Sequence, residues 1–214
     1  MAATQMTSTS GRALRRDALA NQERVLAAAV TTLLRDGRQA SMATIAAAAG
    51  VGVGTLYRRY PNREALLSAL TERSFQKVLA VAEDAADQQG TAMAALDRFL
   101  DRTIEHRDQL VLPLHGGPTA LSSAAADTRA RVHATLEGVL ERGREDGSVR
   151  AGITASDVIA FGAMLAQPLS GTPDWAHTAR RQKMIFLAGV AGPHGALPSD
   201  TPATAHEPEQ RRRP

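Results

Sequence analysis

Apolar residues recur along most of the chain at the three- and four-residue spacing of amphipathic helices. The first such segment ends before Gly37, which stands where a helix C-terminal cap belongs. Its apolar stripe consists of Val25, Leu26, Ala29, Val30, Leu33 and Leu34. We expect about nine helical segments. They lie at about 18–36, 42–48, 53–60, 62–87, 91–107, from Pro118 to 145, 155–169 and 173–190, with a short apolar segment at 110–114.

The composition supports the same fold class. Hydrophobic residues make up 43 % of the 214 residues and aromatic residues only 3 %, so alanine and leucine supply most of the apolar content. Alanine and leucine favour helix, whereas the β-branched residues that favour strands are few. The sequence therefore predicts an all-α protein with a core of ordinary size.

The two ends of the chain differ from this pattern. Residues 1–15 are polar and basic and 193–214 are polar, ending in three arginines, so we expect a disordered arm and a disordered tail. The first residues lack the apolar core of a signal peptide, and no apolar run reaches the roughly 20 residues of a membrane span. Cysteine is absent. We therefore expect a cytoplasmic protein that has no disulfide and no contact with a membrane.

Charge is distributed unevenly. Residues 1–63 hold nine arginines and three acidic residues, a net charge of +6, so the rest of the chain carries −3. A basic N-terminal third on an acidic body is expected when one end meets a polyanion. Arginine-rich codon usage is the alternative, since the whole chain has only two lysines.

Residues 41–60 have the pattern of two short helices that cross at a steep angle. Ser41 can cap the first helix, Ile45 points inward, and Ala46 and Ala49 are small where the second helix must approach. Gly50 supplies the sharp turn, which requires a backbone conformation that is costly for other residues. This pattern predicts a helix-turn-helix.

The second short helix has an outward face with groups suited to DNA. Val51 and Leu56 anchor the helix to the core, which leaves Val53, Thr55, Tyr57, Arg58 and Arg59 to meet phosphates and base edges. Two short helices around a glycine also occur in many other helical proteins, and a tyrosine with two arginines is often only a solvated face. Spacing alone leaves both interpretations open.

This stretch and its flanks resemble the TetR family of bacterial regulators. The residues that carry the resemblance are Ile45-Ala46, Ala49-Gly50-Val51, Gly54-Thr55-Leu56-Tyr57, Tyr60, Asn62-Arg63-Glu64-Ala65-Leu66, Arg24-Val25-Leu26, Ala28-Ala29 and Gly37. They cover about residues 16–70, a quarter of the chain. Where the family usually has serine this chain has Gly52, which offers no hydroxyl to a phosphate, while Arg59 and Arg63 replace a frequent histidine and lysine.

The resemblance and the residue pattern together imply a DNA-binding domain at 16–62. The predicted DNA-binding residues are Ser41, Thr44, Gly52, Val53, Gly54, Thr55, Tyr57, Arg58, Arg59 and Arg63. The resemblance further implies a helical domain at 63–192 that dimerises through its last two helices and encloses an effector pocket. The predicted dimer contacts are Phe161, Gly162, Leu165, Ile185 and Phe186. The alternative is that these faces bury against the chain's own helices.

Candidates for the pocket follow only from residue type and region. They are Phe99, His106, His133, Met164 and Trp175, each of which is more often a core residue than a ligand contact. The six histidines are scattered, no phosphate loop or nucleophile motif is present, and we expect no metal, no cofactor and no catalysis.

The leading hypothesis is a homodimeric repressor that binds a palindromic duplex operator and is released by a small-molecule effector. The alternatives are an architectural DNA binder without an effector and an all-helical enzyme.

Overall fold

The computed structural model describes residues 5–110, 121–167 and 173–192. These residues form eight α-helices and two short 3-10 helices, with no strand beyond an isolated bridge between Val149 and Ala191. The all-α prediction is confirmed. The expected tail at 193–214 and most of the apolar segment at 110–114 lie outside the described residues.

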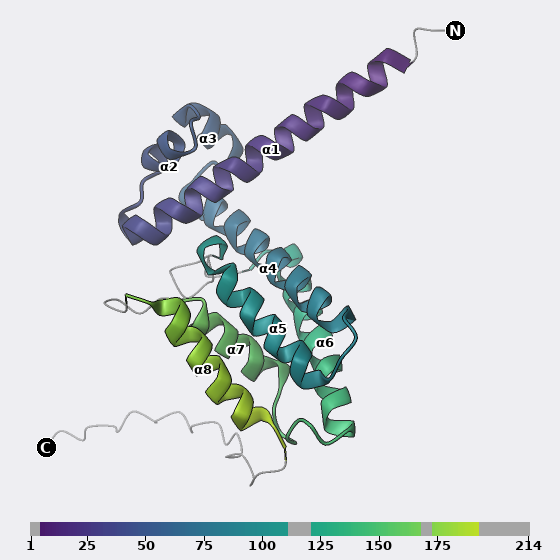
Figure 1. Ribbon diagram of the computed structural model, residues 1–214. Helices are drawn as coiled ribbons and strands as arrows, with labels where there is room; N and C mark the ends of the chain where they lie inside the picture. The colour runs from purple at the N-terminus through teal and green to yellow at the C-terminus, as the bar shows by residue number, and fades with distance from the viewer. Residues whose placement is uncertain (1–4, 111–120, 168–172, 193–214) are drawn as a thin grey trace, which may run out of the picture.

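Three helices form the N-terminal head (Figure 1). They are α1 (Gln5–Asp36), α2 (Met42–Ala48) and α3 (Val53–Arg59), with the 3-10 helix η1 (Gly37–Gln39) between the first two. The Ser41 hydroxyl caps α2 by accepting from the Thr44 amide at 3.0 Å. Gly50 turns the chain between α2 and α3 with φ +65°, a conformation that side chains with a Cβ rarely adopt. The predicted cap and the predicted turn are both confirmed.

Helix α1 is longer than the sequence suggested. It begins at Gln5, so residues 5–15 continue the helix where a disordered arm was expected. The segment contains no proline and only one glycine, Gly11. Once a helix is nucleated, extending it through such residues requires little free energy, because each added residue gains a backbone hydrogen bond. Figure 1 shows this end of α1 projecting beyond the other helices.

The remaining helices form the body. They are α4 (Arg63–Asp87), α5 (Ala92–Glu105), η2 (Arg107–Gln109), α6 (Ser123–Glu145), α7 (Ala155–Leu165) and α8 (Trp175–Val190). The Asn62 side chain caps α4 by accepting from the Ala65 amide at 2.8 Å, as predicted. Helix α8 is capped by Asp174 and begins at Trp175, two residues later than Pro173 had suggested.

Helix α4 connects two separate hydrophobic cores. Its first turns contribute Leu66 and Leu70 to the head core, which also contains Ile45, Leu56 and Tyr60. Its later turns contribute to the body core, which is built from α4 to α8. Both ends of one helix are therefore fixed by packing, and movement of the body relative to the head must involve α4 or the contacts of α1 with η2.

Candidate nucleic-acid interface and ligand cavity

Helix α3 separates a buried side from an exposed side as its sequence predicted. Leu56 is buried in the head core and Tyr60, which follows the helix, is buried beside it. Tyr57 is 46 % exposed, and Val53 and Thr55 are exposed as well. A tyrosine and a valine left in water on a seven-residue helix have no partner within this chain's core. The face is therefore available to another molecule.

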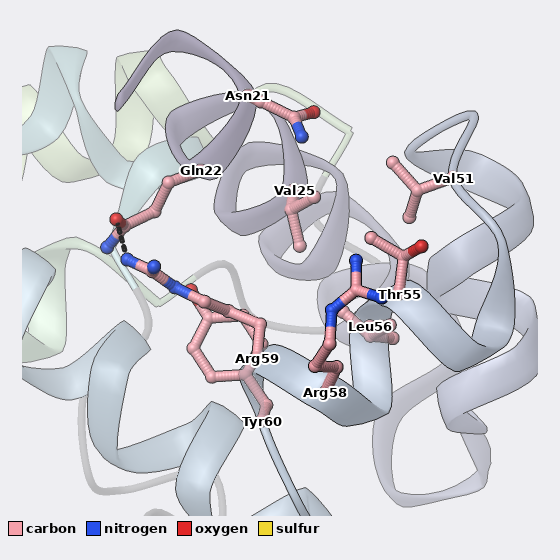
Figure 2. A pocket seen from close by; sticks show the side chains of 9 residues that line it. All are labelled: Asn21, Gln22, Val25, Val51, Thr55, Leu56, Arg58, Arg59 and Tyr60. Atoms are coloured by element: carbon pink, nitrogen blue, oxygen red, sulfur yellow. Dashed lines mark hydrogen bonds between the residues drawn. The ribbon is translucent and has the colours of Figure 1, made fainter. Parts of the chain in front are cut away.

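The two arginines that end α3 lie on opposite sides of a groove between α1 and α3 (Figure 2). The Arg59 guanidinium donates to the Gln22 side-chain oxygen on α1. Arg58 is exposed and lies on the Thr55 side of the groove. The groove has a volume of about 330 Å³, and Val25 and Leu56 are among the apolar residues that line it. Arg59 thus holds α3 against α1, whereas Arg58 has no role in the fold among the described contacts.

Arg63, at the start of α4, also has a partner inside the head. Its guanidinium donates to the carbonyl oxygens of Ala40 and, at 3.5 Å, Gly37. The side chain is half-buried and spans the link between η1 and α2. Arg63, which was predicted to contact DNA from the start of the helix, also braces the head through these two contacts.

The remaining predicted residues lie at the helix starts. Ser41 and Thr44 are exposed at the start of α2, and their hydroxyl oxygens are 2.8 Å apart. Gly52 is the N-cap residue of α3, and its carbonyl accepts from the Thr55 and Leu56 amides. Gly54 is exposed in the first turn, with open space around its Cα. Sequence reasoning missed Asn21 and Gln22, which line the groove from α1, because nothing local to α1 indicates that α3 lies beside it.

The body contains a small apolar cavity between α4, α5, α6 and α7. Its volume is about 40 Å³ and its lining is apolar except for Thr103 and Arg129. The Thr103 hydroxyl donates to the Phe99 carbonyl at 2.8 Å, so its proton is already used. The lining residues are Phe75, Val78, Phe99, Thr103, Leu110, Arg129, Val132, Ile159, Gly162 and Ala163.

Only Phe99 of the five predicted pocket residues lines this cavity. His133 lines a separate shallow depression, and His106 forms the C-cap of α5. Met164 is exposed, and the buried Trp175 donates from its indole nitrogen to the Leu165 carbonyl at 2.8 Å. Selecting residues by polarity and size missed the small and aliphatic side chains that line the cavity.

The comparisons with known proteins agree with this architecture. Residues 25–70 match the family model for bacterial regulatory proteins of the tetR family. No curated protein sequence matches the chain. A TetR transcriptional regulator from Streptomyces coelicolor is 27 % identical, with a TM-score of 0.56, and the match covers 80 % of this chain and 99 % of that one.

Two further solved structures have the same fold. A TetR transcription regulatory protein from Mycobacterium vanbaalenii is 26 % identical, covers 84 % of this chain and 99 % of its own, and has a TM-score of 0.59. The TetR-family regulator PfmR from Thermus thermophilus is 23 % identical, with a TM-score of 0.61, and the match covers 77 % of this chain and 97 % of PfmR. The chain carries the helix-turn-helix domain of the TetR family at residues 25–70 and has the fold of solved TetR regulators. It is a DNA-binding transcriptional regulator with a helix-turn-helix in α2 and α3.

The last two helices, α7 and α8, carry both core and exposed apolar residues. Gly162 and Leu165 are buried in the chain's own core, which corrects their expected place in a dimer contact. Phe161 and Phe186 stack on each other within the chain, with ring centroids 4.1 Å apart. Ile185, a predicted dimer contact, is exposed, and so are Met164 and Met184, which the sequence pattern did not assign to this surface.

None of the described helices is long and apolar enough to span a membrane. The described residues also contain no group of three or more histidine, aspartate or glutamate side chains placed to hold a metal ion.

Proposed function

We propose that the chain is a sequence-specific repressor that binds a palindromic duplex as a homodimer and is released by a small-molecule effector. The observation that carries the proposal is the exposed side of α3, which presents Thr55, Tyr57 and Arg58 to solvent while Leu56 is buried. The Arg58 guanidinium has five N–H donors and no described partner, so it is suited to bind guanine. The Tyr57 hydroxyl is suited to bind a phosphate.

Two-fold recognition is supported by the apolar surface of α7 and α8. Met184 is 68 % exposed, and Ile185 and Met164 are exposed on the same pair of helices. Neighbouring exposed apolar side chains of this kind are typical of a protein contact. An isologous contact would place two copies of α3 on one face of a duplex, about one helical turn apart.

Release by an effector is supported by the cavity in the body. The lining favours an apolar molecule, with Arg129 as the one charged group at its edge. The cavity is smaller than such a molecule, so binding must displace the helices around it. Displacing the body relative to the head would alter the spacing of the two recognition helices.

The test is selection from a random duplex pool, followed by binding measured against the selected and an unselected duplex. We expect the selected sites to be palindromic and to be bound at least about a thousandfold more tightly than random DNA. Equal affinity for both duplexes would contradict sequence-specific recognition. A reporter carrying the selected site in its promoter then distinguishes repression from activation.

A further inference from the structure

Two consecutive residues of α1 are held by arginines from different parts of the chain. The Gln22 side chain accepts from Arg59, the last residue of the recognition helix. The Glu23 carboxylate accepts from Arg73 of α4, whose Nε lies 2.9 Å from Oε1 and 3.0 Å from Oε2 and whose Nη2 also contacts Oε1. Helix α1 therefore links α3 directly to the middle of α4.

Arg73 has a second partner in the body. Its Nη1 donates to the main-chain carbonyl of Gln109 at 3.2 Å. Gln109 is the last residue of η2, and its side-chain oxygen accepts from Lys77, one turn further along α4, at 3.1 Å. Arg73 is only 8 % exposed, so its guanidinium is largely shielded from water, whereas the Glu23 carboxylate that it holds is 55 % exposed. One buried guanidinium thus bridges the head and the end of η2.

The residue after Gln109 lines the ligand cavity. Leu110 is buried and faces that cavity together with Phe75 and Val78 of α4. The cavity holds only about 40 Å³, so a larger molecule must move part of its wall, and Leu110 belongs to that wall. Leu110 cannot move far while the Gln109 carbonyl stays on Arg73. Any such movement must break that hydrogen bond or displace the guanidinium.

We propose that Arg73 is a positioning residue that couples the cavity to the recognition helix by holding the Gln109 carbonyl and the Glu23 carboxylate in one guanidinium plane. The planar fork fixes the direction of all its N–H groups, so displacement at one partner changes the geometry at the other. Glu23 then transmits the shift to α1, and Gln22 transmits it to Arg59. This proposal rests on the proposed function, since it requires DNA at α3 and a ligand in the cavity.

The coupling can be tested without the effector, because linkage between two sites is reciprocal. If the cavity wall alters DNA binding, then DNA must alter the cavity wall. The experiment measures hydrogen exchange in the full-length protein, free and saturated with a duplex selected from a random pool. The amides of Gln109 and Leu110, which donate to His106 and Arg107, report on η2.

In the wild-type chain we expect DNA to slow exchange at these two amides by about fivefold or more, the lower end of measured allosteric couplings. In Arg73→Gln the slowing should disappear while the duplex still binds. Arg73→Lys should behave similarly, because a single ammonium cannot present the fork to both partners. The matched control is Arg131→Gln, which breaks the exposed pair of Arg131 with Glu83 inside the body and should keep the wild-type slowing.

Each result bears on the proposal. Slowing that persists in Arg73→Gln and Arg73→Lys would overturn it, as would DNA binding without any slowing in the wild type. If DNA also fails to slow hydrogen exchange in Arg131→Gln, the specific role of Arg73 is overturned, because any substitution that weakens the body would then have the same effect. A chain that selects no duplex would contradict the proposed function and this coupling together. If Arg73→Gln does not fold, Glu23→Ala removes the same link by deleting the acceptor at an exposed position.

Discussion

The head and the body use charged residues in opposite ways. In the head, arginines lie at the surface and brace one segment against another, as Arg59 does with Gln22 and Arg63 with the Ala40 carbonyl. In the body, Lys183 is buried between α5 and α8 and is paired at 2.7 Å with both Asp97 and Asp101. Among the described residues, the large apolar side chains that the body exposes, Met164, Met184 and Ile185, all lie on α7 and α8.

The difference follows from what each part must meet. A polyanion is met by positive charge at the surface, and the two arginines of α3, Arg58 and Arg59, are both exposed. A protein partner is met by apolar surface, and the one lysine of α8, Lys183, is paired within the fold. Burial alone would lower the pKa of Lys183, but Asp101 and Asp97 outweigh burial and raise it. The body therefore holds this charge within the fold, away from a partner.

The largest expected effect comes from the head core. Leu56→Ala removes a side chain that is almost completely buried, and should lower the free energy of unfolding by about 2–5 kcal/mol. Urea unfolding measures it. Tyr57→Ala, on the exposed face of the same helix, is the control and should change stability by under about 0.5 kcal/mol while weakening DNA binding. Equal losses for both variants would mean that α3 has no separate buried side.

The buried charge of the body gives the next effect. Lys183→Met should cost about 1–3 kcal/mol of unfolding free energy, less than a fully buried pair, because Asp97 and Asp101 keep access to water. Arg131→Gln breaks an exposed ion pair of the same body and should cost no more than about 1 kcal/mol. Calorimetric unfolding of both variants measures the two losses of unfolding free energy. A stabilised Lys183→Met would show that the buried charge is not a net support of the α5–α8 contact.

The exposed apolar residues of α8 should affect assembly. Met184→Glu is expected to raise the dissociation constant of the dimer at least about tenfold, or about 1.4 kcal/mol. Leu34→Glu introduces the same charge at an exposed apolar position of the head and should leave assembly unchanged. Sedimentation of both variants at several concentrations compares the two surfaces. A wild-type chain that sediments as a monomer at micromolar concentration would contradict the proposed dimer.

The smallest effect is the pH dependence of the link between α1 and α4. The hydrogen bonds from Arg73 lower the pKa of Glu23 below its ordinary value of 4.5. A lowered folded-state pKa contributes stability that is present above about pH 4.5 and is lost as pH falls through the folded-state value. The difference in unfolding free energy between the wild type and Glu23→Gln should therefore be constant near neutral pH and shrink below about pH 4.5. A difference that grows on acidification would contradict this pairing.

What the sequence predicted well depends on short-range chemistry. The start of α2 follows from the Ser41 cap, the turn from Gly50, and the start of α4 from Asn62 after Pro61. Each is decided by neighbours within a few residues, so one sequence suffices. The exposed face of α3 follows from the same local spacing.

What the sequence missed depends on distant segments. Arg59 meets Gln22 and Arg73 meets Glu23 across 37 and 50 residues, and no local pattern indicates these pairings. The cavity is lined from four helices, so its residues share no motif. Gly162 was expected in a dimer contact, but a Cβ there would lie 3.5–3.7 Å from side-chain atoms of Leu100, Phe99 and Thr103, which places it inside the core.

If the exposed face of α3 reads base sequence, then Arg58 must contribute more to binding at a specific site than to binding at random DNA. The dissociation constants of the wild type and Arg58→Ala are measured on a selected duplex and on a random duplex at one salt concentration. Arg58→Ala should lose about 1–3 kcal/mol of binding free energy on the selected duplex and much less on random DNA. Equal weakening on both duplexes would contradict it and would make Arg58 a phosphate contact.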